Sequence, residues 1–274
     1  MTSIPTIDLS NGVPIPMIGF GTWPIPDRAA EGLVAAAIET GYRLIDTAEM
    51  YRNEEGVGRG VRASGIDRSE IFVTTKLSQR WHGFDEAQQA FDASSRRLGL
   101  GHIDLFLIHW PNPEMDRYVD AWRGMIELLH AGKARAIGVS NFKTAHLQRL
   151  IDETGMAPHV NQIELNPWVP REQEREFHIE HGIATESWAP IGKGGGLLRD
   201  PVLVDLARQR ERTPAQIVLR WHLQLGLIPI PKTSKRPRLA ENLDVFGFTL
   251  TDDEMRRLSS IDKRHGVNSD QFGL

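Results

Sequence analysis

Short apolar runs alternate with amphipathic segments along most of the chain. The runs are typical of buried strands, and the segments between them place apolar residues at helical spacing. Eight strands are expected, at 17–22, 43–47, 71–76, 104–109, 136–140, 160–164, 183–188 and 228–232. Eight helices are expected between them, near 27–40, 53–62, 85–98, 116–131, 143–152, 171–181, 200–209 and 213–225, and two more near 236–244 and 251–260.

A short hairpin is expected before the first of these strands. Residues 4–8 and 13–16 alternate apolar and polar side chains around Asn11-Gly12. Asn-Gly is the strongest two-residue hairpin signal, because both turn positions tolerate positive φ.

The strand–helix repeat predicts an α/β fold, a (β/α)8 TIM barrel with the short N-terminal β-hairpin and extra C-terminal helices. The first six intervals between strand ends fit one strand, one helix and two short loops, and the seventh is longer because it holds the glycine run 192–196 and two helices. No break in composition separates these units, so residues 1–274 are expected to form a single domain. A doubly wound sheet is the competing fold. Its dinucleotide-binding form has G-x-G-x-x-G after the first strand, whereas here Gly19-Phe20-Gly21 continues into Thr22-Trp23-Pro24.

Polar residues and tryptophans occupy the expected strand ends, where a barrel of this kind carries its active site. They are Trp23, Asp46, Lys76, His109, Trp110, Ser140, Asn141, Gln162, Trp188 and Lys232. Any one of them could simply mark the point where a strand meets solvent. An acid, an ammonium and an imidazole on three consecutive strands, beside Tyr51, instead favour a catalytic cluster.

The residue types in this cluster indicate a proton donor for a developing oxyanion. A phenol keeps its proton at neutral pH, and a nearby ammonium lowers its pKa, which would make Tyr51 a better acid. Asp46 would keep Lys76 charged through an ion pair, and His109 would hydrogen-bond a substrate oxygen. The cluster has no nucleophile with an adjacent base, so a hydride from elsewhere must complete the reaction.

Composition narrows the possible functions. The chain is 40% hydrophobic and 25% charged, with a net charge of −4, which is typical of a soluble globular protein and argues against nucleic acid as a partner. The absence of cysteine excludes disulfides, thiolate catalysis and Cys-ligated zinc. No signal peptide is evident and no apolar run approaches the ~20 residues that span a bilayer, so a cytoplasmic protein without a membrane partner is expected.

Seven segments together resemble the aldo-keto reductase superfamily, and most closely its short bacterial members of the 2,5-diketo-gluconate reductase type. They are DTAEMYRNEEGVG, VTTKL, LIHWP, IGVSN, NQIELNP, SWAPIG and IPIPKTSKRPRLAENL, in this order and spacing over nearly the whole chain. The resemblance implies NAD(P)H-dependent reduction of aldehydes and ketones to alcohols. It also implies a catalytic tetrad of Asp46, Tyr51, Lys76 and His109, with Tyr51 as the general acid.

The resemblance further implies a nicotinamide cofactor extended across the barrel mouth. Ser140, Asn141 and Gln162 would hydrogen-bond its carboxamide, and Trp188 would stack on its ring. The full set of expected cofactor contacts is Gly21, Thr22, Trp23, Asp46, Ser140, Asn141, Gln162, Trp188, Pro190, Ile191, Gly192, Lys232, Thr233, Ser234, Arg238, Glu241 and Asn242.

The segment 232–238 decides the type of cofactor. It carries four positive charges, and read alone it is either a solvated loop or a phosphate site of the kind that barrels place after their last strand. The resemblance implies that Lys232 and Arg238 contact the adenosine 2′-phosphate and that Glu241 and Asn242 contact the adenine. NADPH is therefore expected, with NADH as a weaker cofactor.

The remaining expectations concern the substrate and the assembly. Trp23, Tyr51, His109 and Trp110 are expected to bind a small-molecule carbonyl substrate, and Trp81 and Phe20 are further candidates for the pocket wall. The glycine run 192–196 is either a loop that closes over the cofactor or a surface linker. The protein is expected to be a monomer.

Two other functions are compatible with parts of the sequence. A non-catalytic NADPH-binding sensor on the same fold would keep the tetrad but turn over no carbonyl compound. A metal-dependent hydrolase using Asp46, His109 and Glu164 would need paired His or carboxylate ligands on neighbouring strands, and the sequence offers too few.

Overall fold

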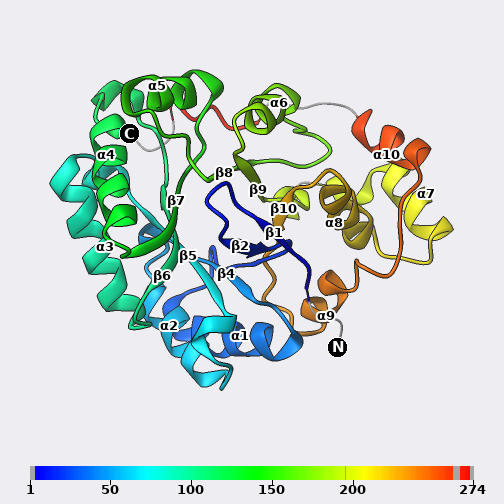
Figure 1. Ribbon diagram of the computed structural model, residues 1–274. Coiled ribbons are helices and arrows are strands. Elements are labelled where there is room, and N and C mark those ends of the chain that lie inside the picture. The colour runs from blue at the N-terminus through cyan, green and yellow to red at the C-terminus, as the bar shows by residue number, and fades with distance from the viewer. Residues whose placement is uncertain (1–3, 195, 262–265, 272–274) are drawn as a thin grey trace.

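Eight parallel strands form the centre of the molecule in the computed structural model, which describes residues 4–194, 196–261 and 266–271. Their order in the sheet follows the chain (Figure 1). They are β3 (Phe20–Gly21), β4 (Leu44–Asp46), β5 (Phe72–Leu77), β6 (Ile103–Ile108), β7 (Ala134–Ser140), β8 (Val160–Glu164), β9 (Ala184–Trp188) and β10 (Ile228–Ile230). The eight expected strands are confirmed, although the first is shorter than the expected 17–22.

Backbone hydrogen bonds between the first and last strands close the sheet into a barrel. The Gly19 amide donates to Pro229 O at 3.1 Å, and the Gly21 amide donates to Pro231 O at 3.0 Å. A Cβ at Gly19 would lie 2.7 Å from the side chain of Ile230, so the closure requires glycine at this point. The expected (β/α)8 fold is therefore confirmed.

Helices surround the strands, as the view along the barrel in Figure 1 shows. They are α1 (Asp27–Thr40), α2 (Glu54–Ala63), α3 (Phe84–Leu98), α4 (Tyr118–His130), α5 (Thr144–Thr154), α6 (Glu172–Glu180), α7 (Pro201–Gln209), α8 (Pro214–Gln224), α9 (Pro237–Leu243) and α10 (Asp252–Ser259). Capping boxes begin α8 at Thr213 and α10 at Thr251. The two expected extra helices at the C-terminal end are present.

The expected hairpin is present, but its turn is not the two-residue turn that Asn-Gly favours. Strands β1 (Thr6–Asp8) and β2 (Pro14–Pro16) pair antiparallel across a five-residue connection. The Leu9 amide donates to Val13 O at 3.0 Å, and φ is positive at Gly12 but not at Asn11. The Asn11 side chain instead donates to the backbone oxygen of Arg135, which fixes the loop to the barrel.

The hairpin closes the N-terminal end of the barrel. Its buried Leu9 and Ile15 belong to one apolar cluster with inward-facing strand residues such as Leu44, Phe72 and Leu105. In Figure 1 the hairpin lies across the ring of strands. Polar chemistry is consequently confined to the opposite end, where the strands finish. None of the helices described is both long and apolar enough to cross a membrane.

Candidate active site

Asp46, Lys76 and Tyr51 meet at the C-terminal end of neighbouring strands. Asp46 ends β4, Lys76 lies in the adjacent β5, and Tyr51 ends the short 3-10 helix η1 (Glu49–Tyr51). The Lys76 ammonium donates to both carboxylate oxygens of Asp46, at 2.8 and 2.7 Å, and to Thr47 O at 2.9 Å. It also lies 3.4 Å from the Tyr51 hydroxyl. The expected ion pair is therefore present, and it places a fixed positive charge beside the phenol.

The Lys76 side chain is charged despite being fully buried. Burial lowers the pKa of Lys76, but the charge of Asp46, the nearby Tyr51, the hydrogen bond to Asp46 and the charge of Glu186 together raise it above its ordinary value. The ammonium form is thus stable through the neutral range.

Lys76 lowers the pKa of Tyr51, as expected, but the net shift of that pKa is upward, so the expected overall lowering is wrong. Burial is the largest influence and raises the pKa of Tyr51; the Lys76 charge lowers it, the Asp46 charge raises it again, and the net shift is upward. Burial of the hydroxyl is the main cause, and the carboxylate 2.7 Å from the ammonium offsets part of the ammonium's field at the phenol. The Tyr51 hydroxyl accordingly keeps its proton at neutral pH.

His109 follows β6 directly and faces Tyr51. The two ring centroids are 5.6 Å apart in an edge-to-face arrangement, and the Trp110 ring lies nearly parallel to the imidazole with its centroid 6.1 Å away. Burial, with a smaller contribution from the Lys76 charge, holds the pKa of His109 well below its ordinary value. A neutral imidazole at this position donates one N–H and does not compete with Tyr51 as an acid.

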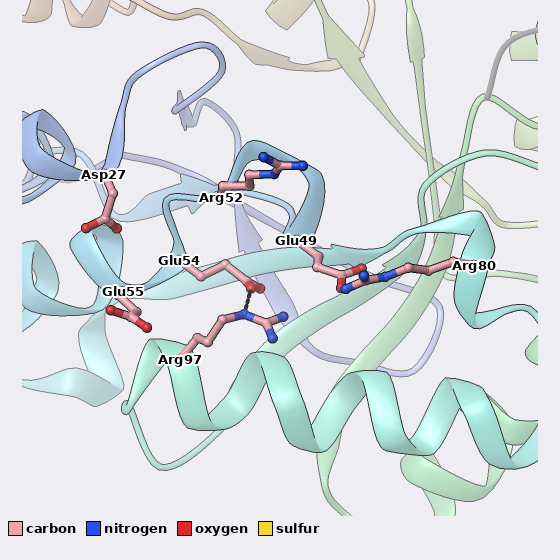
Figure 2. Close-up of a pocket in the computed structure, with 7 residues that line it drawn as sticks. All are labelled: Asp27, Glu49, Arg52, Glu54, Glu55, Arg80 and Arg97. Atoms are coloured by element: carbon pink, nitrogen blue, oxygen red, sulfur yellow. Dashed lines mark hydrogen bonds and ion pairs between the residues drawn. The ribbon is translucent and has the colours of Figure 1, made fainter. Parts of the chain in front are cut away.

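A network of charged residues holds the loop that carries Tyr51. These residues line a cavity of about 350 Å³. Figure 2 draws them as sticks: Asp27, Glu49, Arg52, Glu54, Glu55, Arg80 and Arg97. No tetrad residue lines the cavity. Glu49 accepts hydrogen bonds from Ser78 Oγ and Trp81 Nε1 and pairs with Arg80, while Glu54 pairs with Arg97 at 2.5 Å. These contacts tie η1 and the start of α2 to the segments after β5, so they position Tyr51.

The residues expected to hold the carboxamide lie together beside His109. The Asn141 side-chain amide donates to His109 O at 3.0 Å and to Ser140 Oγ at 2.9 Å. Its oxygen accepts from Trp188 Nε1 at 2.7 Å, and Ser140 Oγ donates to Gln162 O. The ends of β7, β8 and β9 thus form one polar wall next to the tetrad.

Lys193 lies over the ring face of Trp188. Its ammonium is 4.2 Å from the Trp188 ring centroid and 5.4 Å from that of Trp23. A planar ring that stacks on this face of Trp188 must therefore move Lys193 aside. Lys193, the only charged residue in the glycine run 192–196, is a site residue that the sequence pattern did not reveal. Gly195 lies outside the described residues.

The basic segment begins next to the end of β3. A Cβ at Gly21 would lie 3.7 Å from the Lys232 Cβ, so the segment starts at the barrel mouth. Within the described part of the chain its four cations form no ion pair; they are Lys232, Lys235, Arg236 and Arg238. The expected adenine contacts have partners in the protein, since Glu241 accepts from Thr213 and the buried Asn242 bonds Tyr42.

The remaining expected cofactor and substrate residues occupy the same mouth with different exposure. The Thr22 hydroxyl donates to Asp46 O, Pro190, Ile191 and Gly192 follow β9, Thr233 is buried and Ser234 is exposed. Trp23 is half exposed, whereas Trp110 is largely buried against His109. Phe20 is fully buried against Tyr42, so its expected place in the pocket wall is wrong.

Glu186 is a buried carboxyl of the barrel interior that the sequence analysis missed. It lies in β9, opposite Gln162 of β8 and Ile228 of β10, and it is fully buried. Burial, with a further contribution from the Asp46 charge, raises the pKa of Glu186 to about 8, which the bond from Gln162 and the Lys76 charge only partly offset. A carboxyl in this environment is mostly neutral at pH 7.

We expect Glu186→Gln to stabilise the protein at alkaline pH. The carboxyl has a pKa of about 8 when folded and near 4.5 when unfolded, so the folded state binds the extra proton between these values and stability falls as pH rises through them. The amide does not titrate. Thermal melts should therefore show an advantage of several degrees for the variant at pH 8.5 that shrinks toward pH 5.

Glu254→Gln provides a control of opposite sign. Its bond from Arg210 lowers the pKa of Glu254, so the native carboxylate stabilises the fold above its unfolded pKa and this contribution is lost as pH falls. The Glu254 variant should be the less stable one at neutral pH. An advantage of Glu186→Gln that is the same at pH 5 and pH 8.5 would contradict the buried-acid interpretation.

No group of three or more His, Asp or Glu side chains that could hold a metal ion occurs among the residues that the structure describes.

The family model of the aldo/keto reductases matches residues 17–263. The chain belongs to the aldo/keto reductase family. The resemblance inferred from the motifs is thereby confirmed.

Individual relatives support the finer placement. The chain is 51% identical over 265 residues to 2,5-diketo-D-gluconic acid reductase B of Corynebacterium sp. (strain SHS752001), covering 96% of this chain and 95% of that protein. It is 45% identical to methylglyoxal reductase DkgA of Escherichia coli (strain K12) over the full length of both. A crystal structure of a Gox0644 variant in complex with NADPH matches with a TM-score of 0.94 and 45% identity, covering 98% of this chain and 99% of the other.

Proposed function

We propose that this aldo/keto reductase reduces small aldehydes and ketones to alcohols, with NADPH as the hydride donor and Tyr51 as the general acid. The observation that carries the proposal is the position of the Tyr51 hydroxyl, 3.4 Å from a buried ammonium, on a ring that meets the neutral imidazole of His109 edge to face. This arrangement brings a proton donor, a positive charge and an imidazole N–H toward one place, where a carbonyl oxygen would gain negative charge.

Each tetrad residue has a distinct task in this proposal. NADPH, when bound, supplies a hydride to the carbonyl carbon. Tyr51 gives its proton to the carbonyl oxygen, and Lys76 stabilises the phenolate that remains. Asp46 fixes the Lys76 ammonium, and the His109 N–H orients the carbonyl oxygen toward Tyr51. The product alcohol thus gains one hydrogen from the cofactor and one from the protein.

The residues at the barrel mouth fit a phosphorylated nicotinamide cofactor. The cations of segment 232–238, which form no ion pair among the described residues, match its phosphate charge, the Trp188 ring offers a stacking surface once Lys193 moves aside, and the wall formed by Ser140, Asn141 and Gln162 offers polar groups. NADP-type cofactors are also bound in related solved structures, including that of the Bombyx mori aldo-keto reductase, which has a TM-score of 0.88 and 36% identity.

A direct assay tests the proposal. Purified protein should oxidise NADPH, followed at 340 nm as is usual for this cofactor, in the presence of methylglyoxal, simple aldehydes or diketo sugar acids. NADPH binding without turnover of any carbonyl compound would contradict it and would favour the sensor function instead. No specific contact among the residues that the structure describes favours that second function.

We expect Arg238→Ala to reduce the preference for NADPH over NADH. Charge-assisted hydrogen bonds contribute roughly 1.5–3 kcal/mol, so the ratio of kcat/KM for the two cofactors should fall about 10- to 100-fold, through the KM for NADPH. Arg236→Ala is the matched control, because it removes the same charge two residues away. An equal loss in both variants would show that Arg238 contributes only to the general field of the segment.

A further inference from the structure

One amide group joins the two carboxyls inside the barrel. Gln162 Nε2 lies 2.8 Å from Asp46 Oδ2 and 2.8 Å from Glu186 Oε2, so it donates to both. A side-chain amide has two N–H donors. Both are used, one toward the tetrad and one toward β9.

These two bonds fix the direction of the Gln162 side chain. If the amide rotated by half a turn, its oxygen would face two carboxyl groups and both hydrogen bonds would be lost, which is costly for groups that are almost fully buried. Its carbonyl oxygen accepts no hydrogen bond from any residue that the structure describes. The oxygen is therefore the free end of an otherwise fully bonded group.

The Glu186 carboxyl can be buried close to Asp46 because it is neutral. The charged groups that face Glu186 are Asp46 of β4 and Lys76 of β5, which already neutralise each other at 2.7 Å, whereas Ile228 of β10 is apolar. Glu186 Oε1 is buried without a hydrogen-bond partner among the described residues. A protonated carboxyl still accepts the bond from Gln162 through Oε2 without adding charge to the tetrad.

We propose that Glu186 is a positioning residue of the reductase: together with Asp46 it clamps the Gln162 amide so that the free carbonyl oxygen of Gln162 accepts a hydrogen bond from the carboxamide NH2 of the nicotinamide. This inference rests on the proposed function, because it assigns a partner at the same cofactor site. Its consequence is that Glu186, which is fully buried in the barrel, contributes to recognition of the carboxamide through Gln162.

The test compares NADP⁺ with its 3-acetylpyridine analogue, in which a methyl group replaces the carboxamide NH2. Dissociation constants are measured by quenching of tryptophan fluorescence, so the readout does not depend on turnover. The native protein should favour NADP⁺ by about five- to tenfold, as expected for one hydrogen bond. Glu186→Leu should bring this ratio close to one, and Glu186→Gln, whose amide oxygen replaces Oε2, should keep it.

Two further measurements separate positioning from general damage. Thr74→Val alters another buried polar side chain of the barrel without a partner in the described residues, and it should leave the ratio unchanged. In a Gln162→Leu background, Glu186→Leu should have no additional effect on the ratio, because the group it positions is gone. If Glu186→Leu does not fold, the comparison of Glu186→Gln and Gln162→Leu with the native protein still tests the clamp.

The proposal is overturned if the native protein does not discriminate between the two cofactors, if Glu186→Leu keeps the native ratio, or if Glu186→Gln loses it. Failure of the proposed function gives a different result. In that case the native protein would turn over no carbonyl compound with NADPH, while the ratio of dissociation constants would still report on the clamp.

Discussion

Tyr51→Phe is expected to lower kcat for carbonyl reduction by at least about 10³-fold while leaving NADPH binding within about twofold of the native value. The substitution removes only the hydroxyl that lies 3.4 Å from Lys76, and the phenyl ring keeps its edge-to-face contact with His109. The proton donor is lost and the shape of the site is retained. Single-turnover kinetics under saturating NADPH measure the effect, and fluorescence titration measures binding.

Tyr118→Phe is the matched control for this substitution. Tyr118 begins α4 and packs against Phe142 and His146, and it contacts no residue of the tetrad in the described structure. The same loss of a hydroxyl should therefore leave kcat nearly unchanged. Substantial residual turnover by Tyr51→Phe, or a strong loss of NADPH binding, would contradict the role of Tyr51 as general acid.

Lys76→Met is expected to abolish measurable turnover and to destabilise the fold. The variant removes the ammonium that stabilises the phenolate, and it leaves the Asp46 carboxylate buried without its partner. Breaking a buried ion pair by removing one partner costs roughly 3–5 kcal/mol. Chemical denaturation should show this loss, and NADPH oxidation should be at least about 10²-fold slower.

The double variant Asp46→Asn with Lys76→Met separates the two effects. It removes both charges, so most of the lost stability should return while activity should not. Lys133→Met, which removes an exposed lysine paired with Asp92, should change neither property by more than a small amount. Recovery of activity in the double variant would show that Lys76 acts only through stability.

The fold was predictable because its signals are local and repeated. Apolar runs and helical segments alternate along the chain, and the capping residues Thr213 and Thr251 begin helices as their sequence pattern indicates. The hairpin turn was less predictable, because Asn11 has a long-range alternative: its side chain bonds the backbone of Arg135, and only Gly12 adopts positive φ. Such a tertiary contact is invisible in the local pattern.

The site was predictable where its residues end strands and not where they lie deeper. Asp46, Lys76 and His109 stand out as polar residues after apolar runs. Glu186 lies two residues before Trp188 in β9, so the two side chains lie on the same face of the strand. This spacing was the signal that could have revealed Glu186. The direction of the Tyr51 pKa depends on the balance of burial against two opposite charges, which requires distances that only the structure gives.

The closure of the barrel has a consequence for how the protein is made. The bonds that join Gly19 to Pro229 and Gly21 to Pro231 link the beginning of the chain to nearly its end. A nascent chain on the ribosome cannot form these hydrogen bonds until Pro231 has emerged. The barrel therefore stays open beside β3 and the hairpin through most of translation. The same pairing brings Lys232 beside Gly21. A phosphorylated dinucleotide that binds there would therefore stabilise the closed barrel relative to one in which β3 and β10 are unpaired.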